Sequence, residues 1–143
     1  MSKLYYNSDG VYYEVESSSD FGGKPFIVDM HKASIHNEHF RSTFWTGKKM
    51  QLSLMNIQPG LDLGLGMNPV EEDFFLVESG HGVIHLGEHS DVLPINQPIY
   101  PDSAIFVPAG TWRNIINTGT EPLKLYNMSS APYYECSSVQ TDR

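Results

Sequence analysis

The 143-residue chain has a single cysteine, Cys136, and no apolar run that approaches the roughly 20 residues of a membrane-spanning helix. One cysteine excludes a disulfide within the chain and is typical of a reducing compartment. The first residues, Met1–Tyr6, lack the apolar core of a secretory signal peptide. We therefore expect a soluble, cytoplasmic protein.

Basic residues are scarce as well. The chain carries 9 Lys and Arg against 17 Asp and Glu, which gives a formal net charge of −8. This charge disfavours nucleic acids and anionic membrane surfaces as partners, because both attract basic surfaces. Acidity of this kind favours solubility but selects no particular substrate.

Turn-forming residues are abundant instead, with 12 glycines and 9 prolines, and 40% of the residues are hydrophobic. A chain of this length suits one domain with a real core. Short apolar segments between turn signals favour an all-β sandwich or barrel over an α/β fold. Asp91–Pro101, which holds three of the prolines, is expected to be mostly loop. The predicted strands are Met50–Gln58, Phe74–Val77, Val83–Leu86, Ala104–Val107, Trp112–Ile116 and Leu123–Met128.

The N-terminal part has a different pattern. Residues 1–25 alternate tyrosine and valine with polar residues, which predicts one or two edge strands before a loop. We expect a short strand over Phe26–Met30 and one or two helical turns over Met30–Phe40. Within Met50–Gln58 the apolar phase changes between the fifth and sixth residues. That change indicates either a bulge or burial on both faces.

Two longer stretches combine turn signals with strands. Gly60–Gly80 passes from a Pro-Gly turn through a glycine-rich segment and three acids to the apolar run Phe74–Val77. Asp102–Asn117 consists of an apolar strand, a Pro-Ala-Gly-Thr turn and a returning strand. Both patterns are typical of antiparallel hairpins.

The spacing within these stretches resembles the two motifs of the cupin family. The first family motif runs Gly, five residues, His, one residue, His, three or four residues, Glu, six residues, Gly. Here Gly60 and Gly80 match the two glycines. The three metal-ligand positions hold Gly66, Asn68 and Asp73.

The second family motif runs Gly, five residues, Pro, one residue, Gly, two residues, His, three residues, Asn. Asp102 stands in place of the first glycine, while Pro108, Gly110 and Asn117 match. The histidine position holds Arg113. The framework of the motifs is thus present, whereas none of their metal-binding histidines is.

The resemblance covers residues 50–128 and implies an antiparallel jelly-roll barrel with one short helix at most. It predicts one cupin domain over residues 1–143, made of N-terminal strands (1–49), the motif-bearing barrel (50–128) and a polar tail (129–143). As in many cupins, we expect a homodimer formed through the N-terminal strands. The chain looks like small bacterial cupins that are sometimes labelled as similar to mannose-6-phosphate isomerase. Such a label describes the ancestry of the fold and does not establish a reaction.

The resemblance also implies what a metal site would require. Cupins usually hold iron, manganese, nickel or zinc through imidazoles and one carboxylate. Gly66 offers no side chain, Asn68 only a weak amide oxygen, and Arg113 a permanent cation that cannot ligate. Asp73 alone remains a credible donor, so we predict no metal and no other cofactor.

The histidines elsewhere in the chain do not suggest a site. His31, His36 and His39 lie in a polar segment without a carboxylate at a recognised spacing, and we expect them to be solvated. His81 and His85 share one face of a predicted strand whose other face is apolar, so they are expected to point outward.

If the motifs dock as in cupins, Asp73 and Arg113 converge and form an ion pair. They would then bind a ligand together with Asn68 and Phe75. Alternatively, the pair only neutralises two charges that the barrel would otherwise bury.

Two classes of function follow. The first is a metal-independent epimerase, isomerase or lyase acting on a small polar or anionic metabolite. Asp73 would be its base, Tyr100 or Tyr126 its acid, and Arg113 its electrophilic group. The second is a non-catalytic binder or sensor of a small sugar or carboxylate. A metal-dependent isomerase or dioxygenase with atypical ligands is a further alternative.

Overall fold

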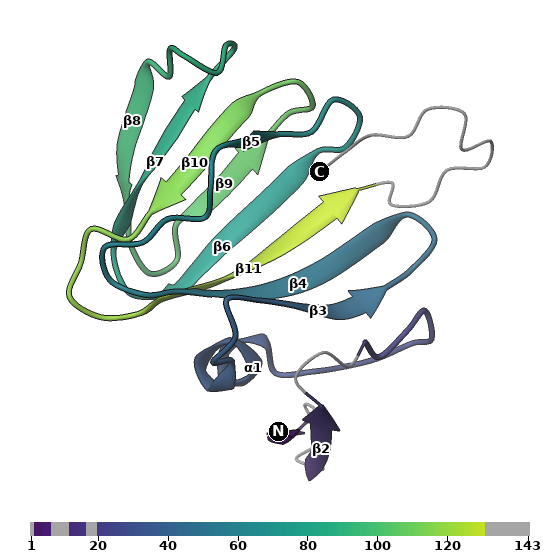
Figure 1. Ribbon diagram of the computed structural model, residues 1–143. Helices are drawn as coiled ribbons and strands as arrows, with labels where there is room; N and C mark the ends of the chain where they lie inside the picture. Colours follow the sequence, from purple (N-terminus) through teal and green to yellow (C-terminus); the bar gives the residue numbers. More distant parts are fainter. Residues whose placement is uncertain (1, 7–11, 17–19, 131–143) are drawn as a thin grey trace.

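The computed structural model describes residues 2–6, 12–16 and 20–130. Within them, nine strands form two antiparallel sheets that pack face to face (Figure 1). One sheet has the order β3 (Arg41–Thr46), β4 (Met50–Ile57), β11 (Leu123–Ser130), β6 (Asp73–Ser79), β9 (Ala104–Val107). The other has the order β5 (Gly66–Met67), β10 (Trp112–Ile116), β7 (Gly82–Gly87), β8 (Ile95–Ile99).

The remaining elements are an N-terminal hairpin of β1 (Ser2–Tyr6) and β2 (Tyr12–Glu16), and the helix α1 (Met30–His36). The predicted all-β antiparallel jelly roll with one short helix is confirmed. The sheets do not close into a barrel, however, because no hydrogen-bonded strand pair joins one to the other among the described residues. No helix in this part of the chain is long and apolar enough to cross a membrane.

The two motif stretches connect the sheets instead of forming hairpins. β5 pairs with β10 in the smaller sheet, whereas β6 and β9 pair with each other in the larger one. The hairpins that we predicted for Gly60–Gly80 and Asp102–Asn117 are therefore wrong. Both stretches cross at the same end of the molecule, where Gly110 N–H donates to the Asn68 carbonyl at 2.8 Å.

The space between the sheets is apolar at one end and polar at the other. Opposite residues of an antiparallel pair share a face, so the register of β11 with β4 and β6 defines the interior. At the apolar end, leucine, isoleucine and valine side chains are fully buried. The polar end holds Asn127, Ser129 and Asp73 on the same face. The buried side chains at the apolar end are Leu123, Leu125, Ile57, Val77, Ile84 and Ile115.

Strand β4 is buried on both faces, as one of our two interpretations of its apolar pattern predicted. Met55 and Ile57 belong to the core between the sheets. Leu52 and Leu54 belong to a second cluster on the outer face, which α1 and the segment before it cover. A bulge does occur nearby, but it lies in β3.

Two predicted segments differ from the structure. Phe26–Met30 forms no strand. Phe26 instead stacks on Phe21, with ring centroids 4.3 Å apart, so packing and not a hydrogen-bonded ladder holds this segment. Conversely, part of the proline-rich segment forms β8, which includes Pro98. An edge strand tolerates proline because one of its sides has no partner strand.

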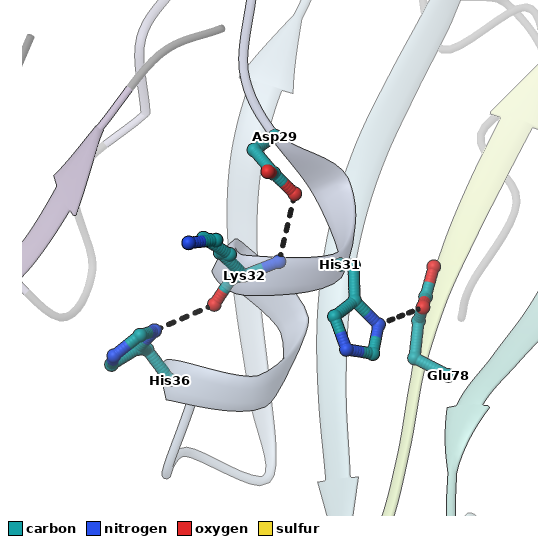
Figure 2. Close-up of polar contacts among 5 residues, drawn as sticks. All are labelled: Asp29, His31, Lys32, His36 and Glu78. Carbon is teal, nitrogen blue, oxygen red and sulfur yellow. Dashed lines mark hydrogen bonds and ion pairs between the residues drawn. The ribbon is translucent and has the colours of Figure 1, made fainter. Parts of the chain in front are cut away.

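Helix α1 was predicted within Met30–Phe40, and its start and its position have identifiable causes (Figure 2). Asp29 caps the helix, because its Oδ1 accepts a hydrogen bond from the Lys32 backbone N–H at 3.1 Å. His31 Nδ1 lies 2.7 Å from Glu78 Oε1 on β6, which fixes one end of the helix to the sheet. At the other end, Lys124 of β11 donates to the carbonyl of Ile35.

Asn117, the last residue of the second motif, fastens the turn that follows β10. Its Nδ2 donates to the carbonyls of Ile57 and Glu121, both at 2.8 Å. Its Oδ1 accepts from the Gly119 N–H at 2.8 Å, and the residue is almost completely buried. The predicted turn over 117–122 is thus stabilised by one buried amide.

We expect Asn117→Ala to lower the free energy of unfolding by about 2–3 kcal/mol, because buried backbone groups lose their partners. Urea denaturation followed by circular dichroism measures the change. Thr118→Ala, at an exposed neighbouring position, is the control and should change stability by less than about 0.5 kcal/mol. Equal effects of the two substitutions would contradict the assigned role.

Candidate ligand-binding site

A cavity of about 280 Å³ lies at the polar end of the space between the sheets. Its volume is close to the lower limit of roughly 300 Å³ for small-molecule sites. The four positions that correspond to the metal ligands of the family motifs all line it, together with neighbours from β3, β4, β5 and β11. The lining residues are Arg41, Gln51, Gly66, Met67, Asn68, Asp73, Arg113 and Ser129.

Arg113 extends from β10 into this cavity. Its guanidinium carbon lies 5.7 Å from the centroid of the Phe75 ring, which is completely buried on β6. Its Nη1 donates to the Gly64 carbonyl at 3.3 Å, and its Nε is buried without a hydrogen-bond partner. Phe75, which we predicted to bind the ligand, therefore packs against the Arg113 guanidinium and is not among the residues that line the cavity.

Gly66 makes room for the guanidinium. The two residues are direct partners in the β5–β10 pair, so side chains at both positions point the same way. A Cβ atom at position 66 would lie 2.8 Å from Arg113 Nη1, which is closer than real contacts of this kind. A side chain at position 66 would therefore require the end of the Arg113 side chain to move.

Asp73 faces the same cavity from β6 but does not pair with Arg113. Its Oδ1 accepts hydrogen bonds from Ser129 Oγ at 2.6 Å and from Asn127 Nδ2 at 3.1 Å. No hydrogen bond or ion pair joins Asp73 to Arg113, although both lie in the described part of the chain. The ion pair that we predicted is therefore absent, and the two charges interact only at longer range.

Burial lowers the pKa of the Arg113 guanidinium below its ordinary value. The Asp73 carboxylate opposes this shift and the Arg41 guanidinium adds to it. Because an arginine remains protonated even after such a shift, Arg113 is a cation at neutral pH. Its charge is only partly compensated by the protein.

Asn68 uses its side chain to close its own loop. Its Oδ1 accepts from the N–H groups of Val70 and Glu71 at 3.1 and 2.8 Å, and its Nδ2 donates to Glu71 Oε1 at 2.9 Å. A metal at this site would have Asp73 as its only anionic donor, next to the Arg113 cation. The residues present do not fit a transition metal.

Neither tyrosine that we predicted as an acid reaches the cavity. Tyr126 follows Leu125 on β11 and therefore points to the outer face, where it contacts the cluster beneath the N-terminal segment. Burial and the nearby Glu78 raise its pKa. Tyr100 is 55% exposed and lies beside a separate cavity between β8 and β9. The structure thus brings together Asp73, Arg113 and Asn68, and leaves both tyrosines apart.

Four residues that line the cavity were missed from the sequence: Arg41, Gln51, Met67 and Ser129. A signal for Ser129 exists, because β11 alternates Leu123, Leu125 and then polar residues on one face. This switch from apolar to polar side chains indicates a cavity at the end of the strand. Arg41 is the first residue of β3, which is far from the two motif stretches in the sequence, and no local pattern predicts that it lines the cavity.

The histidines lie outside the cavity. His31 and His36 are exposed on α1, as expected, and His39 is half-buried. On β7, Ile84 and Leu86 face the core, which places His85 on the opposite face as predicted. Within residues 2–6, 12–16 and 20–130, no three His, Cys, Asp or Glu side chains are grouped so that they could hold a metal ion.

Two packed antiparallel sheets with a polar cavity where the motif stretches cross define the class of jelly-roll proteins with an internal site. More specifically, the chain belongs to the cupin family, since residues 53–129 match the sequence model of the cupin domain.

Individual proteins similar to this chain include two from Bacillus species and one from Escherichia coli. The uncharacterised protein YrkC of Bacillus subtilis is 43% identical over 84% of this chain, which spans 64% of that relative. A crystal structure from Bacillus halodurans is 40% identical, with a TM-score of 0.78, over 81% of this chain and 88% of that one. Mannose-1-phosphate guanylyltransferase 2 of Escherichia coli is 27% identical over 83% of this chain and 26% of its own length.

The donor set leads to a prediction about metal content. The purified protein should carry far less than one equivalent of iron, manganese, nickel or zinc in this cavity, because the cavity supplies no imidazole. Elemental analysis after dialysis measures the content. A stoichiometric metal signal that Asp73→Ala removes would contradict the prediction.

The contact between positions 66 and 113 can be tested with a double-mutant cycle. Gly66→Ala should displace the guanidinium and destabilise the protein, whereas the same change in an Arg113→Ala background should cost less. We expect a coupling energy of about 1 kcal/mol in urea unfolding. Additive effects of the two substitutions would show that the side chains do not compete for space.

Proposed function

We propose that this cupin binds a small anionic metabolite in the cavity between its sheets, with Arg113 as the group that binds the anion and without a metal. The observation that carries the proposal is the environment of Arg113. Its guanidinium lies in the cavity with one hydrogen bond to Gly64 and no ion pair to Asp73. Most of its donors are therefore not engaged by the described residues.

A guanidinium suits this role because it is planar and permanently charged. Its parallel N–H groups match the two oxygens of a carboxylate or the oxygens of a phosphate. The interaction is stronger in a partly buried cavity than in water, because the surroundings screen the charges less. Phe75 beneath the guanidinium keeps it in place for an incoming ligand.

Binding or sensing is better supported than acid–base catalysis. An epimerase, isomerase or lyase of the kind that we considered needs a proton donor opposite Asp73. No histidine, tyrosine or second carboxylate lines the cavity in the described part of the chain. A metal-dependent isomerase or dioxygenase would lack its ligands for the reasons given above.

We also propose the partner class and the compartment that were expected from the sequence. The partner is a small molecule and not a nucleic acid or a membrane, and the protein acts in the cytoplasm. Association into a homodimer through the N-terminal strands remains a prediction, which size-exclusion chromatography with light scattering can test.

Arg113→Gln removes the charge while keeping most of the side-chain length, and it should weaken anion binding at least tenfold. Arg113→Lys should weaken it less, because the lysine ammonium keeps the positive charge, although it lacks the parallel N–H groups of the guanidinium. Isothermal titration calorimetry with carboxylates, phosphates and mannose 1-phosphate measures binding, the last compound being suggested by the name of the guanylyltransferase relative.

Lys48→Gln is the control, because it makes the same change in charge at an exposed position outside the cavity. It should leave binding unchanged. If no anion binds in a way that depends on Arg113, the proposed function is wrong and Arg113 has a structural role only.

A further inference from the structure

Of the three charged side chains that line this cavity, Arg113 and Asp73 have opposite charges but form no ion pair with each other. Arg113 comes from the smaller sheet and Asp73 from the larger one. A guanidinium and a carboxylate in a partly buried cavity usually close into a hydrogen-bonded pair. Since no pair is formed, the protein must hold each group in place by other contacts.

On the side of Asp73, the contacts come from β11. Ser129 is directly opposite Asp73 in the β6–β11 register, and its Oγ donates to Oδ1 at 2.6 Å. Asn127 Nδ2 donates to the same oxygen at 3.1 Å. Oδ1 is thus occupied twice, while Oδ2 accepts no hydrogen bond from the described residues. The carboxylate is oriented, with one oxygen left as a strong acceptor.

On the side of Arg113, the guanidinium is held by the Gly64 carbonyl and by the Phe75 ring. These contacts keep it from swinging toward Asp73. The cavity therefore presents the Arg113 cation on the wall of the smaller sheet. The wall of the larger sheet presents the Asp73 acceptor, with the Arg41 cation as a further charged group.

We infer that the ligand carries an anionic group and, beside it, a hydroxyl or ammonium group that donates to Asp73 Oδ2. This inference rests on the proposed function and assigns the second half of the site. Arg113 binds the anion, and Asp73 determines specificity. An acid that lacks this donor brings its negative charge near Asp73 and leaves Oδ2 of the Asp73 carboxylate without a hydrogen bond. Both effects weaken its binding.

Hydroxy acids and amino acids share this chemistry and differ in the charge of the donor. Two matched series separate them. Propionate, lactate and alanine have the same carbon skeleton with hydrogen, hydroxyl or ammonium at one position, and succinate, malate and aspartate repeat the comparison with a longer skeleton. Titrations followed by two-dimensional NMR give dissociation constants and show directly whether the protein remains folded.

In the natural protein, lactate or alanine should bind at least tenfold more tightly than propionate, and the second series should show the same order. Asp73→Asn keeps an oxygen for Ser129 but removes the charge. It should strengthen propionate binding and weaken binding of the favoured compound, so that the preference falls at least fivefold. A stronger response of alanine than of lactate would identify amino acids as the ligands, and the reverse would identify hydroxy acids.

Ser129→Ala provides a second variant that retains the Asp73 charge. Because it removes the 2.6 Å hydrogen bond, it should reduce the preference for lactate or alanine while propionate remains a poor ligand. A structural role for Ser129 alone would change stability but not this ratio.

Two outcomes would overturn the inference, and they are distinguishable. If all compounds of a series bind equally and Asp73→Asn changes nothing, Asp73 does not select the ligand, although anion binding by Arg113 stands. If no compound binds in an Arg113-dependent manner, the proposed function fails, and the inference about Asp73 fails with it.

Discussion

A polar group between two packed sheets must find a partner or remain solvated, and this requirement shapes half of the interior of this protein. At one end, apolar side chains such as Leu125 and Ile115 exclude water completely. At the other, one oxygen of Asp73 accepts hydrogen bonds from two donors on β11, and the Arg113 guanidinium packs against the Phe75 ring. The cavity lies where charged side chains replace close apolar packing. The site is therefore the polar continuation of the core, built on the same strands.

The protein keeps the cupin arrangement of motif stretches but places a different positive charge in it. In a metal-containing cupin the local cation is an ion held by imidazoles. Here it is a guanidinium attached to the chain, flanked by glycine at position 66. A guanidinium binds and orients an anion through directional hydrogen bonds, but it has no open coordination position to activate water or oxygen. This difference favours recognition over the chemistry that a metal would supply.

The sequence was sufficient for the fold class and for part of the site, and the reasons differ. Turn signals and apolar runs placed the last strands well, because these signals are local. The pairing of strands is not local, so the two hairpins were assigned wrongly and Arg41 was missed. Asp73 and Arg113 were found because motif spacing fixes positions on strands. Tyr126 was misplaced although its parity with Leu125 already put it on the opposite face.

The close contact between Gly66 and Arg113 also restricts the order in which this site can change over generations. A side chain cannot enter position 66 without disturbing the guanidinium, whereas Arg113 can be shortened without a clash. Single substitutions toward a histidine-lined site are therefore unequal: shortening the side chain at 113 meets no obstacle, whereas a side chain at 66 requires the end of Arg113 to move.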